Sequence, residues 1–132
     1  MSDLSRLDGV VVLVVEDNSD SRTLLRELLE SRGASVVTAG TGSEALRIVE
    51  TKPPDVLLSD IEMPVMNGYM LMEKLRQKRI DVPAAAVTAF TGPEARIKSI
   101  TAGFRFHIAK PFDVADLLKK VAILAGGIGI QA

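Results

Sequence analysis

The sequence predicts an α/β protein, (βα)5, in which five β-strands alternate with five α-helices and pair into one parallel sheet. Five short apolar segments, rich in β-branched residues or alanine, recur along the chain, and a helix-like stretch follows each of them. The first and third segments are almost wholly apolar, as expected for strands covered by helices on both faces. A length of 132 residues fits one domain. The expected strands are 10–15 (VVVLVV), 35–39 (SVVTA), 55–59 (DVLLS), 83–89 (PAAAVTA) and 104–109 (FRFHIA).

The first three helices are predicted from apolar spacing and from residues that cap helix ends. Asn18 or Ser19 can begin the first helix and Gly33 can end it. Thr41 and Glu44 have the Thr-x-x-Glu spacing of a capping box for the second helix. The side chains expected to face the core are Leu24, Leu25, Leu28 and Leu29 in the first helix, Ala45, Leu46 and Val49 in the second, and Gly68, Leu71, Met72 and Leu75 in the third.

The last two helices differ in how strongly they are patterned. Thr91 and Glu94 form a second candidate capping box, but Ile97 and Ile100 are the only large apolar residues that follow, so this helix is expected to be the most loosely held. Asp113 is a candidate cap for the fifth helix, whose apolar residues are closely spaced. They are Val114, Leu117, Leu118, Val121 and Leu124.

Composition excludes several classes of function. The formal charge is -1 and no block of like charge occurs, so nothing favours nucleic acid or a membrane surface as a partner. Cysteine is absent, which excludes disulfides and thiolate chemistry. The longest apolar run is far shorter than a membrane span, and no signal-peptide pattern precedes it. A cytoplasmic location is therefore expected.

Polar residues stand where the predicted strands end. They are Glu16 and Asp17 after the first strand, Asp60 after the third, Thr88 in the fourth and Lys110 after the fifth. In an open parallel sheet these ends meet at one edge, where ligands bind. Alone, each residue has an ordinary structural explanation: an acidic pair often caps a helix, a lysine usually faces solvent, and threonine is common in strands. The coincidence of all of them favours a site.

The chemistry expected of this site is phosphoryl transfer. Crowded carboxylates repel one another unless a cation neutralises them, and Mg²⁺ suits a few oxygen ligands. A lysine ammonium and a threonine hydroxyl suit the oxygens of a phosphoryl group. Asp60 would be the nucleophile and would form an acyl phosphate.

Four motifs in order resemble the receiver domains of bacterial two-component response regulators, including the chemotaxis regulators. They are VLVVEDN (12–18), DVLLSDIEMPVMNGY (55–69), VTA (87–89) and AKP (109–111), and the resemblance extends from about residue 10 to about residue 125. It implies a flavodoxin-like fold with strand order 2-1-3-4-5. It divides the chain into an N-terminal extension (1–9), a receiver domain (10–125) and a glycine-rich tail or linker start (126–132).

The resemblance assigns a role to each site residue. Asp60 would accept the phosphoryl group, Lys110 would contact it, and Thr88 would close on it as a switch residue. Asp17 and Asp60 would ligate Mg²⁺ directly, Glu16 through water, and Glu62 through its backbone carbonyl. Pro111 would follow a cis peptide bond, and Pro64 and Gly68 match the loop that leads into the third helix.

Four positions depart from the usual pattern of the family. Glu16 replaces the more common aspartate, and its longer side chain favours indirect metal coordination. Glu62 and Phe90 occupy positions that tune how readily water reaches the acyl phosphate, and Phe90 is expected to lengthen the phosphorylated lifetime. His107 stands where a switch Tyr or Phe is usual, so it is either a switch residue or a partly buried imidazole without that role.

The expected partners are a sensor histidine kinase or a histidine phosphotransfer protein, with the first helix as the docking surface. The downstream target, or a covalently linked output domain, is not identified. The domain is expected to be no enzyme beyond its own phosphorylation and dephosphorylation.

Three alternatives remain open at this stage. A haloacid-dehalogenase-type phosphatase also uses a strand-end aspartate, but it needs an aspartate at position 62 and metal ligands late in the chain. A flavin- or nucleotide-binding module would need a phosphate-binding glycine motif, and AGTG (39–42) lacks the spacing. The third is a degenerate receiver that serves only for docking.

Overall fold

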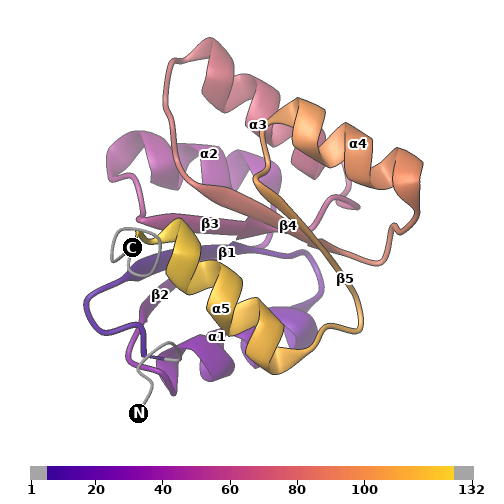
Figure 1. Cartoon of the computed structure of the whole chain (residues 1–132). Coiled ribbons are helices and arrows are strands. Elements are labelled where there is room, and N and C mark those ends of the chain that lie inside the picture. The colour runs from indigo at the N-terminus through magenta and orange to yellow at the C-terminus, as the bar shows by residue number, and fades with distance from the viewer. Residues whose placement is uncertain (1–5, 127–132) are drawn as a thin grey trace.

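The computed structural model describes residues 6–126 and contains the predicted alternation of strands and helices (Figure 1). Each expected strand is present, although the fifth begins at Phe106 rather than at residue 104. The elements are β1 (Val11–Val15), α1 (Ser19–Glu30), β2 (Ser35–Ala39), α2 (Gly42–Thr51), β3 (Val56–Ser59), α3 (Gly68–Gln77), β4 (Ala84–Thr88), α4 (Pro93–Ala102), β5 (Phe106–Ala109) and α5 (Val114–Leu124).

All strand pairs are parallel, and the sheet order is β2-β1-β3-β4-β5, as predicted. The winding reverses at β1, which lies between β2 and β3. Every residue of β3 and β4 is buried, in agreement with their apolar sequences. The edge strand β2 instead alternates exposed and covered residues, because Val36 packs on the core beside α1 whereas Val37, on the other face, is exposed.

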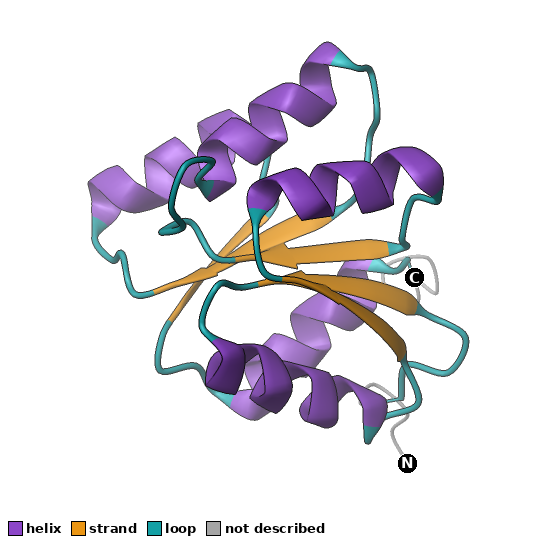
Figure 2. Ribbon diagram, turned by 180° about the vertical axis from the view of Figure 1, so that it is seen from behind, coloured by secondary structure: helices purple, strands orange, loops and turns teal. Residues whose placement is uncertain are grey.

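Helices cover both faces of the sheet and produce two apolar cores (Figure 2). On one face, α1 and α5 pack side chains such as Leu29 and Leu117 against the sheet. On the other face, α2 and α3 contribute Val49 and Leu71 among others. Alternating side chains of β1 divide between the two cores, since successive strand residues point to opposite faces.

Four helices begin with a side-chain cap, and three of these caps were predicted. Asn18, Thr41 and Asp113 accept hydrogen bonds from backbone N–H groups in the first turns of α1, α2 and α5. Glu44 completes the second cap by accepting from the Gly40 N–H at 2.9 Å. Asn67 caps α3 in the same way and was not predicted.

The capping box predicted at Thr91 is wrong. Helix α4 begins at Pro93, with Gly92 at the cap position and no side-chain cap. Because proline is favoured in the first helical position, the helix starts at Pro93 and the cap position falls on Gly92. Thr91 therefore lies one residue before the cap position.

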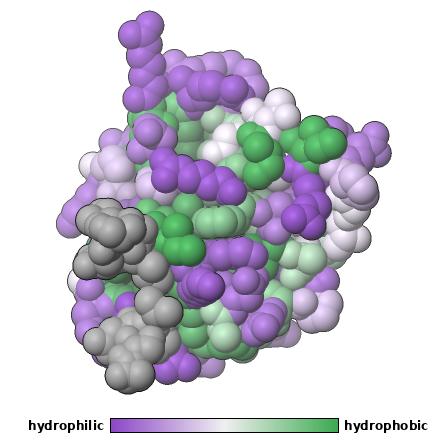
Figure 3. Space-filling model, in the orientation of Figure 1, coloured by the Kyte–Doolittle hydropathy of each residue, from purple (hydrophilic) through white to green (hydrophobic). Residues whose placement is uncertain are grey.

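Some predicted core residues face solvent. Leu24 is 57% exposed, whereas Leu25 and Leu29 are buried. A step of one residue turns a helix by about 100°, which takes Leu24 out of the buried stripe. In α4, the helix expected to be the most loosely held, Ile97 and Ile100 are exposed, and Ser99 is the buried residue. Figure 3 shows hydrophobic side chains on the surface over α4, among hydrophilic neighbours.

The folded core includes a residue that precedes the predicted start of the domain at residue 10. Leu7 is buried among residues of α1 and α5, and its N–H donates to the carbonyl of Arg32. Residues 1–5 of the expected extension and 127–132 of the expected tail lie outside the described residues. Within 6–126, no helix has the length and apolarity needed to cross a membrane.

Candidate functional site

The predicted site residues lie at the carboxyl edge of the sheet. The pairing of β1 with β3 aligns Val15 with Ser59, so the residues that follow these strands, Glu16 and Asp60, emerge side by side. The pairing of β4 with β5 aligns Thr88 with Ala109. An open cavity of about 630 Å³ is lined by Glu16, Asp17, Asn18, Ser21, Asp60, Glu62, Met63, Pro64, Ala89 and Lys110.

Glu16 is a buried carboxylate, 2% exposed, held by hydrogen bonds from two directions. Its Oε1 accepts from the Lys110 ammonium at 2.6 Å, and its Oε2 accepts from the Asn18 N–H at 3.2 Å. Burial raises the pKa of Glu16, and the nearby Asp60 carboxylate raises it further, while the bond from Lys110 opposes both effects. Asp17, next in the chain, is exposed at the mouth of the cavity.

Asp60 has its two carboxylate oxygens in different surroundings. Oδ1 accepts from the backbone N–H groups of Ile61 at 2.6 Å and Glu62 at 3.1 Å. Oδ2 accepts from the Lys110 ammonium at 3.0 Å. The loop returns close behind the aspartate at Gly68, where a Cβ atom would lie 2.6 Å from the Asp60 carbonyl oxygen. Only glycine fits there without displacing the backbone that holds Asp60.

Lys110 joins the two buried carboxylates. It follows β5, and its peptide bond to Pro111 is cis, as predicted. Burial alone lowers the pKa of a lysine, but hydrogen bonds to Glu16 and Asp60 outweigh it, so the pKa of Lys110 is raised. The ammonium therefore stays protonated and neutralises part of the charge of the cluster.

Three carboxylates are close enough to share one cation. Oxygens of Glu16, Asp17 and Asp60 all lie within 4.8 Å of one another. A set of oxygen ligands with an open side fits a hard divalent ion such as Mg²⁺, which binds few protein oxygens and retains waters. The donor set of this chain therefore fits the metal that the sequence predicted. Glu62 lines the same cavity.

Thr88 forms no hydrogen bond with Asp60 in this structure. Its side chain is fully buried, and its Oγ1 accepts from the N–H of Phe90 at 3.2 Å. Phe90 itself is 41% exposed. The predicted hydroxyl is thus beside the cavity rather than in it.

His107 lies between helix α4 and the loop that follows Thr88. The Phe90 carbonyl can only accept, so the Nε2–H of His107 donates to it at 2.8 Å. The other ring nitrogen, Nδ1, is 2.7 Å from the hydroxyl of Ser99, which is completely buried in α4. In a neutral ring with its proton on Nε2, Nδ1 then accepts a hydrogen bond from the Ser99 hydroxyl.

Sequence reasoning missed several groups that shape the site. Ser99 carried no signal, since its partner is on another element. Arg22 donates from Nη1 to the Glu16 carbonyl at 2.8 Å and fixes the turn after β1. The backbone N–H groups that hold Asp60 Oδ1 are independent of residue type and cannot be read from side chains.

Fold and site together define a class: flavodoxin-like α/β proteins with an acidic site at the carboxyl edge of a parallel sheet. Residues 12–122 match the response regulator receiver domain, and the chain belongs to this family. It is a receiver domain of two-component systems, which is a signalling domain rather than a catalytic enzyme. Family membership sets aside the phosphatase alternative.

Individual relatives agree with this assignment. The chain is 38% identical to the "Uncharacterized 14.6 kDa protein in sodA1 3'region" of Leptolyngbya boryana, over 92% of each chain. It is 37% identical to the transcriptional regulatory protein PrrA of Mycobacterium tuberculosis, over 86% of this chain and 48% of PrrA. The solved structure of chemotaxis protein CheY4 of Vibrio cholerae superposes with a TM-score of 0.81 at 31% identity, covering 87% of this chain and 98% of CheY4. This chain thus spans about half of PrrA.

Proposed function

We propose that Asp60 accepts a phosphoryl group from a phosphohistidine in a Mg²⁺-dependent reaction. The observation that carries the proposal is the position of Asp60, whose Oδ1 is held by two N–H groups while Oδ2 faces Lys110. One oxygen is thus fixed by the backbone, and the other is the oxygen for attack on phosphorus.

In the transfer, the P–N bond of the donor histidine breaks as a P–O bond to Asp60 Oδ2 forms. Lys110 is placed to move from the carboxylate to an oxygen of the arriving phosphoryl group. Bound Mg²⁺ would supply positive charge that offsets the negative charge of the phosphoryl oxygens. Asp17 and Asp60 would ligate it directly, Glu16 through water, and Glu62 through its backbone carbonyl.

The test is incubation with Mg²⁺ and a small phosphodonor such as acetyl phosphate, followed by intact-mass measurement. A gain of one phosphoryl group that requires Mg²⁺ and is lost in Asp60→Asn supports the proposal. A gain that survives Asp60→Asn contradicts it. No gain at all favours the degenerate receiver that serves only for docking.

Glu62 and Phe90 are proposed to set the lifetime of the acyl phosphate. Glu62 lines the cavity, and Phe90 is the exposed apolar residue two positions after Thr88. An apolar ring there would restrict the water that hydrolyses the product. Phe90→Ala should therefore lose phosphate faster, and an unchanged rate would remove Phe90 from this role.

Thr88 and His107 are proposed to transmit phosphorylation to α4. Closure of the Thr88 hydroxyl on the phosphoryl group would break its bond with the Phe90 N–H, and the Phe90 carbonyl is the group that holds His107. The movement would then reach Ser99 in α4. His107→Ala should be phosphorylated normally, but α4 amides should no longer change their NMR shifts on phosphorylation. Unchanged shift differences would leave His107 as a packing residue.

The proposed donors are a sensor histidine kinase or a histidine phosphotransfer protein in the cytoplasm, and α1 is the proposed docking surface. Leu24 supports this surface, since it is a large apolar side chain that α1 leaves exposed. Leu24→Asp should slow transfer from a phosphohistidine protein but not from acetyl phosphate. Equal slowing with both donors would indicate a damaged site instead. The downstream target or linked output domain is not identified.

A further inference from the structure

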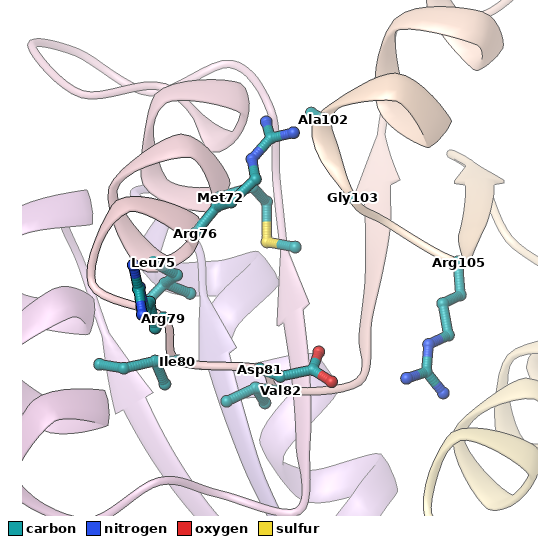
Figure 4. A pocket seen from close by; sticks show the side chains of 10 residues that line it. All are labelled: Met72, Leu75, Arg76, Arg79, Ile80, Asp81, Val82, Ala102, Gly103 and Arg105. Carbon is teal, nitrogen blue, oxygen red and sulfur yellow. The ribbon is translucent and has the colours of Figure 1, made fainter.

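A second cavity lies at the edge of the sheet opposite the carboxylate site. Its volume is about 320 Å³, within the range of about 300–1,000 Å³ typical of small-molecule pockets. Its walls come from the carboxyl-terminal parts of α3 and α4 and from the segments that lead into β4 and β5 (Figure 4). It shares no lining residue with the carboxylate cavity, so the proposal that follows goes beyond phosphoryl transfer.

The inner part of this cavity is apolar. Met72 and Leu75 of α3 and Val82, just before β4, are buried core residues that also line it. Side chains of this kind offer a surface on which a flat ring can pack away from water.

The rim of the cavity is charged and mainly positive. Arg76, Arg79 and Arg105 line it together with Asp81. Arg76 is paired with Glu73 at 3.5 Å, so the two other arginines and Asp81 leave one net positive charge. In Figure 4, Arg76 extends from α3 toward Ala102 at the end of α4, and Arg105 extends from the segment that enters β5. Within residues 6–126, Arg79, Arg105 and Asp81 form no ion pair, so their charges are available to a ligand.

Arg79 occupies a backbone position that favours glycine. Its φ is 58°, in the left-handed region, and it follows Lys78, the residue that caps the end of α3. The Ile80 N–H donates to the Leu75 carbonyl and the Arg79 N–H donates to the Arg76 carbonyl, which is the helix ending that usually contains glycine. The chain instead places a guanidinium group at this position on the rim. Strained positions of this kind are frequent at ligand sites.

We propose that this cavity binds a nucleotide, with its phosphates on Arg79 and its base on the apolar floor. Guanidinium groups suit phosphate oxygens because they form paired, charge-assisted hydrogen bonds. The Asp81 carboxylate accepts hydrogen bonds from the N–H or O–H donors of a base or ribose. A nucleoside diphosphate combines the negative charge, the flat ring and the donors that this lining recognises.

The test is a titration of the ¹⁵N-labelled protein with ADP and with GDP in EDTA, which removes divalent metal from the carboxylate site. The proposal expects amide shift changes confined to residues 72–82 and 102–105 with at least one of the two. Adenosine, guanosine and pyrophosphate alone should each bind at least about tenfold more weakly, since each lacks half of the contacts. Pyrophosphate binding as tight as that of the nucleotide overturns the proposal.

Arg79→Gly is the informative variant, since glycine suits this backbone and the protein should melt at a higher temperature. Its affinity for the nucleotide should fall at least about tenfold. Arg47→Ala, an exposed arginine of α2, is the matched control and should bind normally. An unchanged affinity in Arg79→Gly, an equal loss in Arg47→Ala, or no localised shifts with either nucleotide each overturns the proposal.

Discussion

Helices α4 and α5 flank β5 in the chain and have ten and eleven residues, but they are attached to the sheet in different ways. Helix α5 buries five apolar side chains: Leu117, Leu118, Val121, Ala122 and Leu124. Helix α4 buries only Ser99, and Ile97 and Ile100 are 64% and 54% exposed. A helix held by few apolar contacts can shift at low free-energy cost. The comparison indicates that α5 belongs to the scaffold, whereas α4 can respond to the site.

The largest effect on the free energy of unfolding is expected in α5, the helix that belongs to the scaffold. Leu117→Ala removes a completely buried side chain and should lower the free energy of unfolding by about 2–5 kcal/mol. Urea denaturation followed by circular dichroism measures this loss. A loss below about 1 kcal/mol, the cost expected of an exposed or loosely packed site, would contradict the assignment of α5 to the rigid part.

Lys110, which lies between β5 and α5, should give the next largest effect, and that effect should depend on pH. Its raised pKa means that its stabilising contribution is complete below the ordinary value of 10.5 and is lost as the pH rises through the raised value. At pH 7, Lys110→Met should therefore lower the free energy of unfolding by the full contribution of the lysine. This loss is roughly 2 kcal/mol in metal-free protein, because two buried carboxylates lose their cation.

The loss in Lys110→Met should be smaller near pH 4.5. Burial raises the pKa of Glu16, so this carboxylate takes up a proton readily as the pH falls and then no longer needs a cation. Unfolding curves at both pH values, in EDTA, measure the difference. An equal loss at the two pH values would show that the charge of the cluster is not its cause.

In α4, Ser99→Ala should lower the free energy of unfolding by only about 1 kcal/mol, the net value of one hydrogen bond. The same variant removes the partner of His107 Nδ1, so amide hydrogen exchange in α4 should become faster while exchange in α5 is unchanged. Acceleration of both helices together would show that α4 and α5 open as one unit, which contradicts the comparison.

The smallest expected effect is that of Ile97→Lys, which should change the free energy of unfolding by less than about 0.5 kcal/mol, since the side chain already faces solvent. Thermal denaturation provides the measurement. A larger loss would mean that α4 is packed more tightly than its exposed isoleucines indicate.

The strand order and the strand-end residues could be predicted because both depend on local patterns. Apolar runs mark buried strands, and parallel pairing brings their ends to one edge, which located Glu16, Asp60 and Lys110 correctly. The resemblance to the family supplied the cis bond before Pro111.

The errors have a common physical cause, which is that patterns do not specify contacts across elements. Helical spacing placed Leu24 in the buried stripe, although only the packed neighbours decide how wide that stripe is. The bond between Ser99 and His107 joins two elements that share no periodic signal. The cavity at Arg79 depends on a backbone conformation that arginine rarely adopts.

The three consecutive alanines of β4, Ala84 to Ala86, have a mechanical consequence. All are fully buried, and with such short side chains there is little side-chain motion between the strand and the layers above and below it. Strand β4 should therefore be rigid, with Thr88 as its last residue. A displacement of α4 relative to this strand would then have to be taken up by the exposed segment 89–92, which ends at Gly92 with a φ of 100°.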